Sequence, residues 1–220
     1  MGIAERKEKQ KLEIRKLILD ASLKIIQEEG FEQLTMRKIA DLIEYSATTV
    51  YLYFKDKNEL FFHLHTIGFS QLTEKNQNLL TISNPLLRLY KMGENYIEFG
   101  LENPELYDIM FIQRAPMATL EMMVDCDWSH GDAALGQLKN LLTECMDRKL
   151  IQPAPVEAVA MAIWGMVHGL VSLAIRDRLK HLLAGELDKT ARLHHTITTQ
   201  ELKESMHQSL NWLISTIDKQ

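Results

Sequence analysis

The chain has 220 residues, of which 46% are hydrophobic and 25% are charged, and this composition excludes an intrinsically disordered or fibrous protein. The length allows either one large domain or a small domain joined to a medium one. Two cysteines are too few for a disulfide scaffold, and residues 1–16 lack the apolar stretch that a secretion signal needs, so we expect a cytoplasmic protein.

Charge is unevenly distributed along the chain. The net charge is −5, yet residues 1–60 contain eleven basic and eleven acidic side chains, so residues 61–220 carry the whole acidic excess. Within residues 1–16 six basic side chains outnumber three acidic ones. A DNA-binding surface needs only a local basic patch, and the acidic remainder can lie away from the duplex. The acidic balance is therefore compatible with DNA binding.

Apolar residues recur at helical spacing along the chain, while glycine and proline are sparse and alternating strand patterns are almost absent. The first predicted helix runs from about Lys9 to Glu29 and ends at Gly30, a residue that adopts left-handed conformations at low cost. Its apolar stripe contains Ile14, Leu17, Ile18, Ala21 and Ile25. The predicted fold is all-α.

Two short helices follow, each with a capping side chain at its start. Thr35 caps the first and Ser46 caps the second, and only Glu44 and Tyr45 lie between the helices. A connection this short forces a steep angle, which is typical of a helix-turn-helix motif rather than of a bundle hairpin. The predicted inward residues are Met36, Ile39, Ala40 and Ile43 in the first helix and Val50 and Phe54 in the second.

The rest of the chain is predicted to be a helical bundle. A capping-box pattern at Asp56 and Glu59 starts a fourth helix that reaches about Leu80. Further helices are predicted to start at Asn84, Asn103 and Asp132.

The segment from Ala158 to Ile175 contains 18 residues without a formal charge, which is the lower edge of the length that spans a membrane. It is rich in alanine, glycine and methionine, and it includes His168 and Ser172. A soluble helix that is buried by its own domain on one side and by a partner subunit on the other has the same composition. We favour this dimer helix over a membrane span.

Two stretches of sequence resemble one known family. Residues 30–40 read GFEQLTMRKIA and residues 45–60 read YSATTVYLYFKDKNEL. Together they resemble the TetR family of bacterial regulators, over about residues 10–62. The resemblance implies a helix-turn-helix DNA-binding domain at residues 1–56 and an effector-binding and dimerisation domain at residues 57–220.

The chain departs from the TetR pattern at two positions. Glu44 stands where the family usually has a glycine in the turn, and Thr48 stands where it often has a small residue. Because glycine tolerates a positive φ at low cost, Glu44 either accepts some strain or the turn differs slightly.

The resemblance also implies which side chains meet DNA, with the second helix of the motif in the major groove. Base-reading positions are occupied by Arg37, Ala47, Thr48 and Tyr51. Phosphate-contacting positions are occupied by Thr35, Thr49, Tyr53 and Lys57. A guanidinium suits guanine, methyl groups suit thymine, and hydroxyl and ammonium groups suit phosphate. The alternatives are that Arg37 is a solvated helix residue and that Tyr51 is partly buried in the core.

A second, shorter match concerns residues 164–169, which read WGMVHG and resemble a Trp-x-x-x-His-Gly signature of one branch of TetR C-terminal domains. Gly165 and Gly169, preceded by Ala158 and Ala162, allow two helix backbones to approach closely. We therefore expect a homodimer that binds a palindromic duplex. The last helix is predicted to complete the partner surface with a stripe of Leu202, Met206, Leu210, Leu213, Ile214 and Ile217.

The resemblance implies that a small molecule binds the C-terminal domain and moves the fourth helix, and that repression with release by the effector is the usual mode. The candidate effector-binding residues are Phe62, His65, Phe69, Tyr96, Phe99, Tyr107, Met110, Phe111, Met161, Trp164 and His168. Their character favours a hydrophobic effector. For any single one of them, core packing is the simpler explanation.

Other functions have less support. No nucleophile with a base, glycine-rich phosphate loop or paired carboxylates indicates an enzyme, and we expect no cofactor. Metal sensing would need a complete ligand set, which no pair of candidates provides. A regulator of the same fold that answers a protein partner, or no effector at all, stays an alternative. The metal-ligand candidates are His63 with His65, Cys126 with His130, and His194 with His195.

Overall fold

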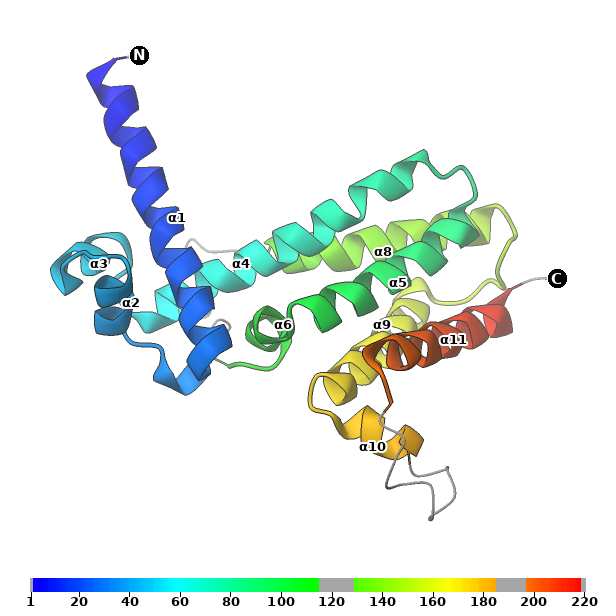
Figure 1. The fold of residues 1–220 in the computed structure, drawn as a ribbon. Coiled ribbons are helices and arrows are strands. Elements are labelled where there is room, and N and C mark those ends of the chain that lie inside the picture. The colour runs from blue at the N-terminus through cyan, green and yellow to red at the C-terminus, as the bar shows by residue number, and fades with distance from the viewer. Residues whose placement is uncertain (1, 115–128, 185–196, 219–220) are drawn as a thin grey trace. The chain divides into compact units, whose positions relative to one another are not determined.

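The computed structural model describes residues 2–114, 129–184 and 197–218, and within these ranges the chain is helical (Figure 1). Apart from one isolated β-bridge between Ile151 and Asp218, these ranges contain no paired strands, which confirms the all-α prediction. The helices are α1 (Ile3–Glu29), α2 (Met36–Leu42), α3 (Ala47–Tyr53), α4 (Lys57–Lys75), α5 (Pro85–Glu102), α6 (Pro104–Phe111), α8 (Ser129–Asp147), α9 (Val156–Ala174), α10 (Arg178–Ala184) and α11 (Thr199–Ile217), with 3₁₀ helices η1 (Phe31–Gln33) and η2 (Gln77–Thr81).

The chain forms two compact units. Unit 1 combines Met1–Phe69 with Glu105–Trp128, and unit 2 combines Ser70–Pro104 with Ser129–Gln220. Helix α4 therefore begins in unit 1 and ends in unit 2. The domain boundary between residues 56 and 57 stays a prediction.

Helix α1 supplies one side of the core of unit 1. It begins at Ile3 instead of Lys9, because residues 3–8 contain no helix breaker and the Glu5 carboxylate accepts a hydrogen bond of 2.7 Å from the Gly2 amide. Leu17, which belongs to the apolar stripe of this helix, is 42% exposed. The buried face is rotated away from it and contains Ile18, Leu19, Ala21, Ser22, Ile25 and Ile26.

The end of α4 is set by an asparagine from another helix. The helix stops at Lys75 instead of reaching Leu80, and a 3₁₀ helix follows it. The Asn95 amide donates to the Lys75 carbonyl at 3.1 Å and to the Asn76 side-chain oxygen at 3.0 Å. The first bond satisfies a backbone carbonyl that a longer helix would have used, which allows the α-helix to end there.

Helix α5 is the centre of unit 2 and packs against α8, α9 and α11. Its start is as predicted, because the Asn84 side chain accepts bonds from the amides of Leu86 at 2.9 Å and Leu87 at 3.3 Å. Helix α8 begins at Ser129, before the predicted Asp132. The buried residues of α5 are Pro85, Leu89, Gly93, Tyr96, Ile97, Phe99 and Gly100.

The apolar stripe of α11 is mainly part of this core, which corrects its prediction as a partner surface. Leu202, Met206, Leu210 and Ile214 are each at most 1% exposed within a single chain. They are already covered by unit 2, so a partner cannot bury them again. The outer side of α11 instead carries Trp212, which is 70% exposed.

Helix α9 is long and apolar enough to cross a membrane when judged by length and composition alone. This is weak evidence, because the core helix of a soluble protein passes the same test. One side of α9 packs inside unit 2 through Ala160, Ile163, Val167, Val171 and Ala174, each at most 4% exposed. The helix therefore already has a protein-packed face.

The close approach of α5 and α11 can be tested at Gly93. A Cβ atom at this position would lie 2.6 and 2.9 Å from the two terminal carbons of Leu210. We expect Gly93→Ala to lower the free energy of unfolding by about 1–3 kcal/mol despite alanine's better helix propensity. Urea denaturation at one protein concentration measures this change. Gly136→Ala, where the added carbon meets nothing within 4 Å, should instead stabilise by roughly 1 kcal/mol. Equal effects of the two would contradict the close packing.

Candidate DNA-binding site and effector region

Helix α3 has the caps and the buried face that the sequence predicts. The Ser46 hydroxyl accepts a hydrogen bond of 3.1 Å from the Thr49 amide, and Thr35 caps α2 by the same geometry with Lys38 at 3.1 Å. Val50 and Phe54 are fully buried in the core of unit 1. Because one side of α3 is buried through these two residues, its opposite side must face away from unit 1.

The base-reading candidates differ in their exposure. Thr48 and Arg37 are exposed, and Tyr51 is 54% exposed, which rules out the alternative that Tyr51 is a core residue of the subunit. Ala47 is half-buried and packs against the core. Leu52, which was not among the candidates, is 78% exposed on the same short helix. The outer face of α3 thus presents small, hydroxyl and aromatic groups together.

The phosphate-contacting candidates are partly engaged within unit 1. The Thr49 hydroxyl lies 2.9 Å from the Ser46 hydroxyl, and Tyr53 is half-buried against the core. The Lys57 ammonium donates to the Phe31 carbonyl at 3.3 Å and lies 5.2 Å from the centre of the Phe31 ring. A phosphate contact by Lys57 would therefore compete with these interactions.

The turn between α2 and α3 places Glu44 in a left-handed conformation. Its φ is 59°, the region that glycine occupies at low cost. The following amide, of Tyr45, donates to the Ala40 carbonyl at 3.0 Å and closes the turn. Of the two outcomes expected for Glu44, the strained one is observed. Gly30, at the end of α1, also has a positive φ of 93°, although its ψ of 162° is not that of a left-handed helix.

Arg15 contacts the end of α3 and was not predicted as a functional residue. Its guanidinium donates to the Tyr53 carbonyl at 3.2 Å and lies 4.5 Å from the centre of the Phe54 ring. The only signal in the sequence was that Arg15 belongs to the basic segment of residues 1–16. Arg15 and Tyr53 are 38 residues apart, so no local pattern links them.

Five of the effector candidates form a contiguous aromatic group within unit 1. Ring centres are separated by 6.4 Å for Phe62 and His65, 4.9 Å for His65 and Phe69, 5.3 Å for Phe69 and Phe111, and 4.7 Å for Phe111 and Tyr107. Met110 packs directly against Gly68, where an added Cβ would lie 2.3 Å from its sulfur. Most of this group is buried, as a packed core would be.

Three other candidates meet within unit 2. The Trp164 indole donates to the Tyr96 hydroxyl at 3.2 Å, and that hydroxyl lies 3.4 Å from Nδ1 of His168. Burial, followed by the charge of Arg176, lowers the pKa of His168 below its ordinary value, which favours a neutral ring. Phe99 is buried separately on α5.

Met161 is 53% exposed on α9, so it is not part of the subunit core. It faces outward together with Ala158, Ala162 and Gly165, which are also exposed.

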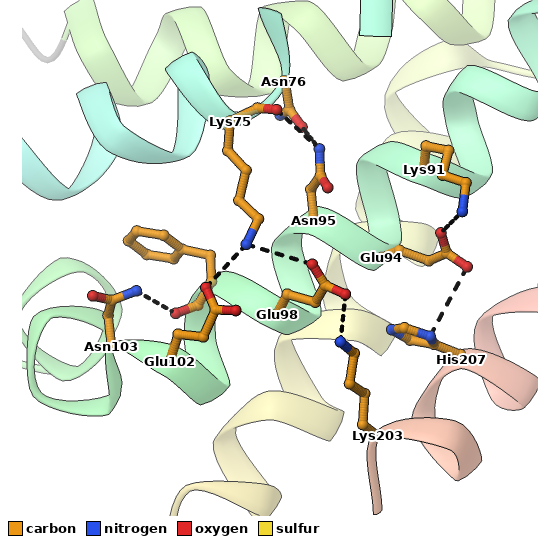
Figure 2. Close-up of polar contacts among 11 residues, drawn as sticks. Lys75, Asn76, Lys91, Glu94, Asn95, Glu98, Glu102, Asn103, Lys203 and His207 are labelled. Carbon is orange, nitrogen blue, oxygen red and sulfur yellow. Dashed lines mark hydrogen bonds and ion pairs between the residues drawn. The ribbon is translucent and has the colours of Figure 1, made fainter. Parts of the chain in front are cut away.

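A network of charged and amide side chains connects the end of α4 with α5 and α11 (Figure 2). The Lys75 ammonium lies 3.0 Å from Glu102 and 3.5 Å from Glu98, and Glu98 also contacts Lys203 of α11 at 2.5 Å. The hydrogen bond from Lys203 is the main reason that the pKa of Glu98 is lowered, with Lys75 adding to it and burial opposing it. Nδ1 of His207 on α11 lies 3.9 Å from the Glu94 carboxylate of α5. Within unit 2, the network therefore joins the C-terminal end of α4 to α5 and α11.

Among the residues that the structure describes, no three histidine, cysteine, aspartate or glutamate side chains come together as a metal site would require. The pair His194 and His195, Cys126 and the side chain of His130 lie outside the described residues.

Comparison with known proteins gives two family matches. The model described as "Bacterial regulatory proteins, tetR family" matches residues 18–64, and "Tetracyclin repressor-like, C-terminal domain" matches residues 89–199. The HTH-type transcriptional regulator YhgD of Bacillus subtilis is 31% identical over 168 residues, covering 71% of this chain and 82% of YhgD. The chain belongs to the TetR family.

Two further relatives agree with this membership. An HTH-type transcriptional regulator of Haemophilus influenzae is 31% identical over 97 residues. This match covers 44% of this chain and 52% of that relative. The solved structure of the regulator FadR from Bacillus halodurans superposes with a TM-score of 0.65 at 19% identity, covering 89% of this chain and 93% of FadR. As a TetR-family member, the protein is a DNA-binding transcriptional regulator whose helix-turn-helix is formed by α2 and α3.

The strain at Glu44 predicts the effect of restoring a glycine in this TetR turn. We expect Glu44→Gly to raise the free energy of unfolding by about 1 kcal/mol, because glycine adopts the left-handed conformation without a Cβ clash. Denaturant unfolding followed by circular dichroism provides the measurement. The same replacement at Gln27, an exposed position near the end of α1, should have the opposite sign. A loss of stability in Glu44→Gly would show that the turn is not strained.

Proposed function

We propose that this TetR-family regulator is a cytoplasmic repressor that binds a palindromic operator as a homodimer and leaves it when a hydrophobic small molecule binds. The observation that carries the proposal is the short helix α3, which is buried through Val50 and Phe54 and exposes Thr48 and Tyr51 on its other side. A helix of this kind can enter the major groove with its exposed face against the base edges.

In the proposed complex, the base edges are read from α2 and α3. Arg37 donates a two-pronged pair of hydrogen bonds to guanine, while the Ala47 and Thr48 methyl groups contact thymine and Tyr51 adds a hydroxyl and a flat apolar surface. The hydroxyls of Thr35, Thr49 and Tyr53 and the Lys57 ammonium bind phosphate oxygens, which positions the protein without specifying sequence.

The proposed dimer forms through the outer face of α9. A Cβ atom added at Gly165 or Gly169 would meet nothing within 4 Å, and Ala158 and Ala162 continue this open face toward the start of the helix. Small residues at such spacing let a second backbone approach closely. The exposed side chains of Met161 on α9 and Trp212 on α11 supply apolar area that a partner could cover. A two-fold axis would place two reader helices about 34–36 Å apart, one turn of the duplex.

The proposed effector is apolar with a small number of hydrogen-bonding groups. The aromatic group in unit 1 and the Tyr96, Trp164 and His168 group in unit 2 each combine large apolar surfaces with a few polar atoms. FadR of Bacillus halodurans, which shares the fold, is described as a fatty acid degradation regulator. For an effector to release DNA, it must bind the conformation that does not fit the operator more tightly than the one that does.

Selection of bound sequences from random duplexes tests the DNA reading directly. We expect a palindrome, and we expect Arg37→Ala to relax the preference at one base pair per half-site by about 1–3 kcal/mol. The double variant Tyr53→Phe, Lys57→Gln should weaken binding to all duplexes and reduce the salt dependence. Anisotropy titrations at several salt concentrations measure both effects, with Lys149→Gln in unit 2 as the control. Unchanged affinities in both variants would contradict the proposed docking.

The dimer surface is tested by filling the open face of α9. Gly165→Leu adds a side chain where the subunit leaves space, so the subunit should fold while the dimer dissociates more readily, by at least about tenfold. Sedimentation equilibrium gives the dissociation constant. Gly136→Leu on α8, where the subunit also leaves space, should keep the wild-type constant. If both variants dimerise like the wild type, the partner surface lies elsewhere.

A further inference from the structure

The C-terminal end of α3 is held from behind by Arg15 of α1. The guanidinium donates one hydrogen bond to the Tyr53 carbonyl at 3.2 Å and covers the Phe54 ring at 4.5 Å. The Tyr53 carbonyl is one of the last in α3, where no further helical amide can reach it, so Arg15 acts as a C-terminal cap supplied by another helix. Tyr53 and Phe54 follow the exposed residues of α3 directly, and Arg15 therefore helps to orient the reading face.

Arg15 is in turn held by His63 of α4. Nη2 of Arg15 lies 2.5 Å from Nε2 of His63. A guanidinium can only donate, so Nε2 must be the acceptor, and the neutral ring must carry its proton on Nδ1. The His63 ring also packs edge-on against Phe54, with ring centres 5.5 Å apart. Arg15, Phe54 and His63 thus form one cluster that joins α1, the end of α3 and α4.

The same nitrogen of His63 also faces a carboxylate. Nε2 lies 3.9 Å from Oε1 of Glu59, one turn earlier on α4. The other carboxylate oxygen of Glu59 accepts a hydrogen bond of 2.6 Å from the Lys55 amide, in the connection between α3 and α4. A protonated ring donates from Nε2, so it can bond to Glu59 but no longer to Arg15. The two partners of this nitrogen therefore belong to different protonation states.

We propose that Arg15 and His63 are positioning residues that hold α3 in its DNA-reading orientation only while His63 is neutral, so that protonation of His63 weakens DNA binding. Protonation replaces a hydrogen bond between Arg15 and the ring with repulsion between two cations. Arg15 then withdraws from the Tyr53 carbonyl and the Phe54 ring, and the end of α3 loses its cap. The inference rests on the proposed DNA reading through α3.

The environment of His63 gives the direction of the pH dependence. Burial, and then the charge of Arg15, lower its pKa below the ordinary value of 6.5, while Glu59 raises it in part. Arg15 on α1 and Glu59 on α4 are the charged groups that act on the ring in the described chain, and α3 contributes only the Phe54 ring and a carbonyl. The neutral ring therefore prevails at pH 7.5. The cluster is lost as the pH falls below 6.5 through the lowered pKa, not as it rises.

The experiment compares wild type with His63→Gln by anisotropy titration of the selected operator at pH 7.5, 6.5 and 5.5 and constant ionic strength. A glutamine side-chain oxygen can accept from Arg15 but cannot be protonated in this range. We expect the two proteins to bind equally at pH 7.5, and wild type to bind progressively more weakly than His63→Gln as the pH falls to 5.5. The loss at pH 5.5 should stay below about tenfold, because the pKa of His63 lies below 6.5. The ratio of the two affinities removes the general effect of pH on DNA binding. A ratio that stays constant with pH overturns the proposal.

Two further variants separate positioning from folding. Arg15→Lys keeps the charge but lacks the planar guanidinium, which bonds to the Tyr53 carbonyl and to His63 through two different nitrogens. It should weaken binding to the operator and to an unrelated duplex alike by about tenfold at pH 7.5. Wild-type affinity in this variant overturns the role of Arg15. His207→Gln on α11 is the matched control, because burial also lowers the pKa of His207, and it should keep the pH profile of wild type. Circular dichroism at each pH checks that every variant is folded.

A measurement without DNA distinguishes failure of the inference from failure of the proposed function. Nitrogen-15 NMR of the histidine rings at pH 7.5, assigned through His63→Gln, should show His63 protonated on Nδ1 and unprotonated on Nε2. The opposite tautomer overturns the cluster even if DNA binding is tight. If wild type has the expected tautomer but binds no duplex, the DNA-reading proposal is wrong instead. The proposed effect of His63 protonation on DNA binding is then wrong as well.

Discussion

Helix α3 has only seven residues, and a helix of this length is not stable in isolation, so its orientation is imposed by its surroundings. The burial of Val50 and Phe54 imposes it from the inner side. The Ser46 cap at one end and the Arg15 guanidinium at the other complete the set of constraints. The exposed outer face of α3 is not needed to anchor the helix, so in the proposed function it is free to contact DNA. The proposed function rests on this separation between a buried anchor and an exposed face.

Helix α4 begins in unit 1 and ends in unit 2. At its first turns Glu59 and His63 contact the connection after α3 and the arginine that caps α3. At its last turn Lys75 is bound by two carboxylates of α5, and one of these, Glu98, also binds α11 (Figure 2). Each end of α4 is thus held by polar interactions with residues of its own unit.

The two helices predicted to meet a partner behave differently in the subunit. Helix α9 buries one side in unit 2 and leaves its glycine and alanine face open, which is compatible with the proposed dimer. The apolar stripe of α11 is mainly buried within the subunit, and Trp212 is exposed on the outer side of this helix. Apolar periodicity reports that a face is buried, but it does not report by which neighbour.

Local chemistry explains which features could be predicted from the sequence. The caps at Thr35, Ser46 and Asn84 bond to amides two or three residues away, so the residue types in a short window determine them. The fold class was predictable from helical periodicity, whereas the sequence left open whether Glu44 is strained or the turn differs, and the structure decided this. Only the tertiary structure decided the end of α4, the neighbours of the α11 stripe and the cluster of Arg15 with His63. Those two residues are 48 positions apart, and their contact exists only because the core brings α1 and α4 together.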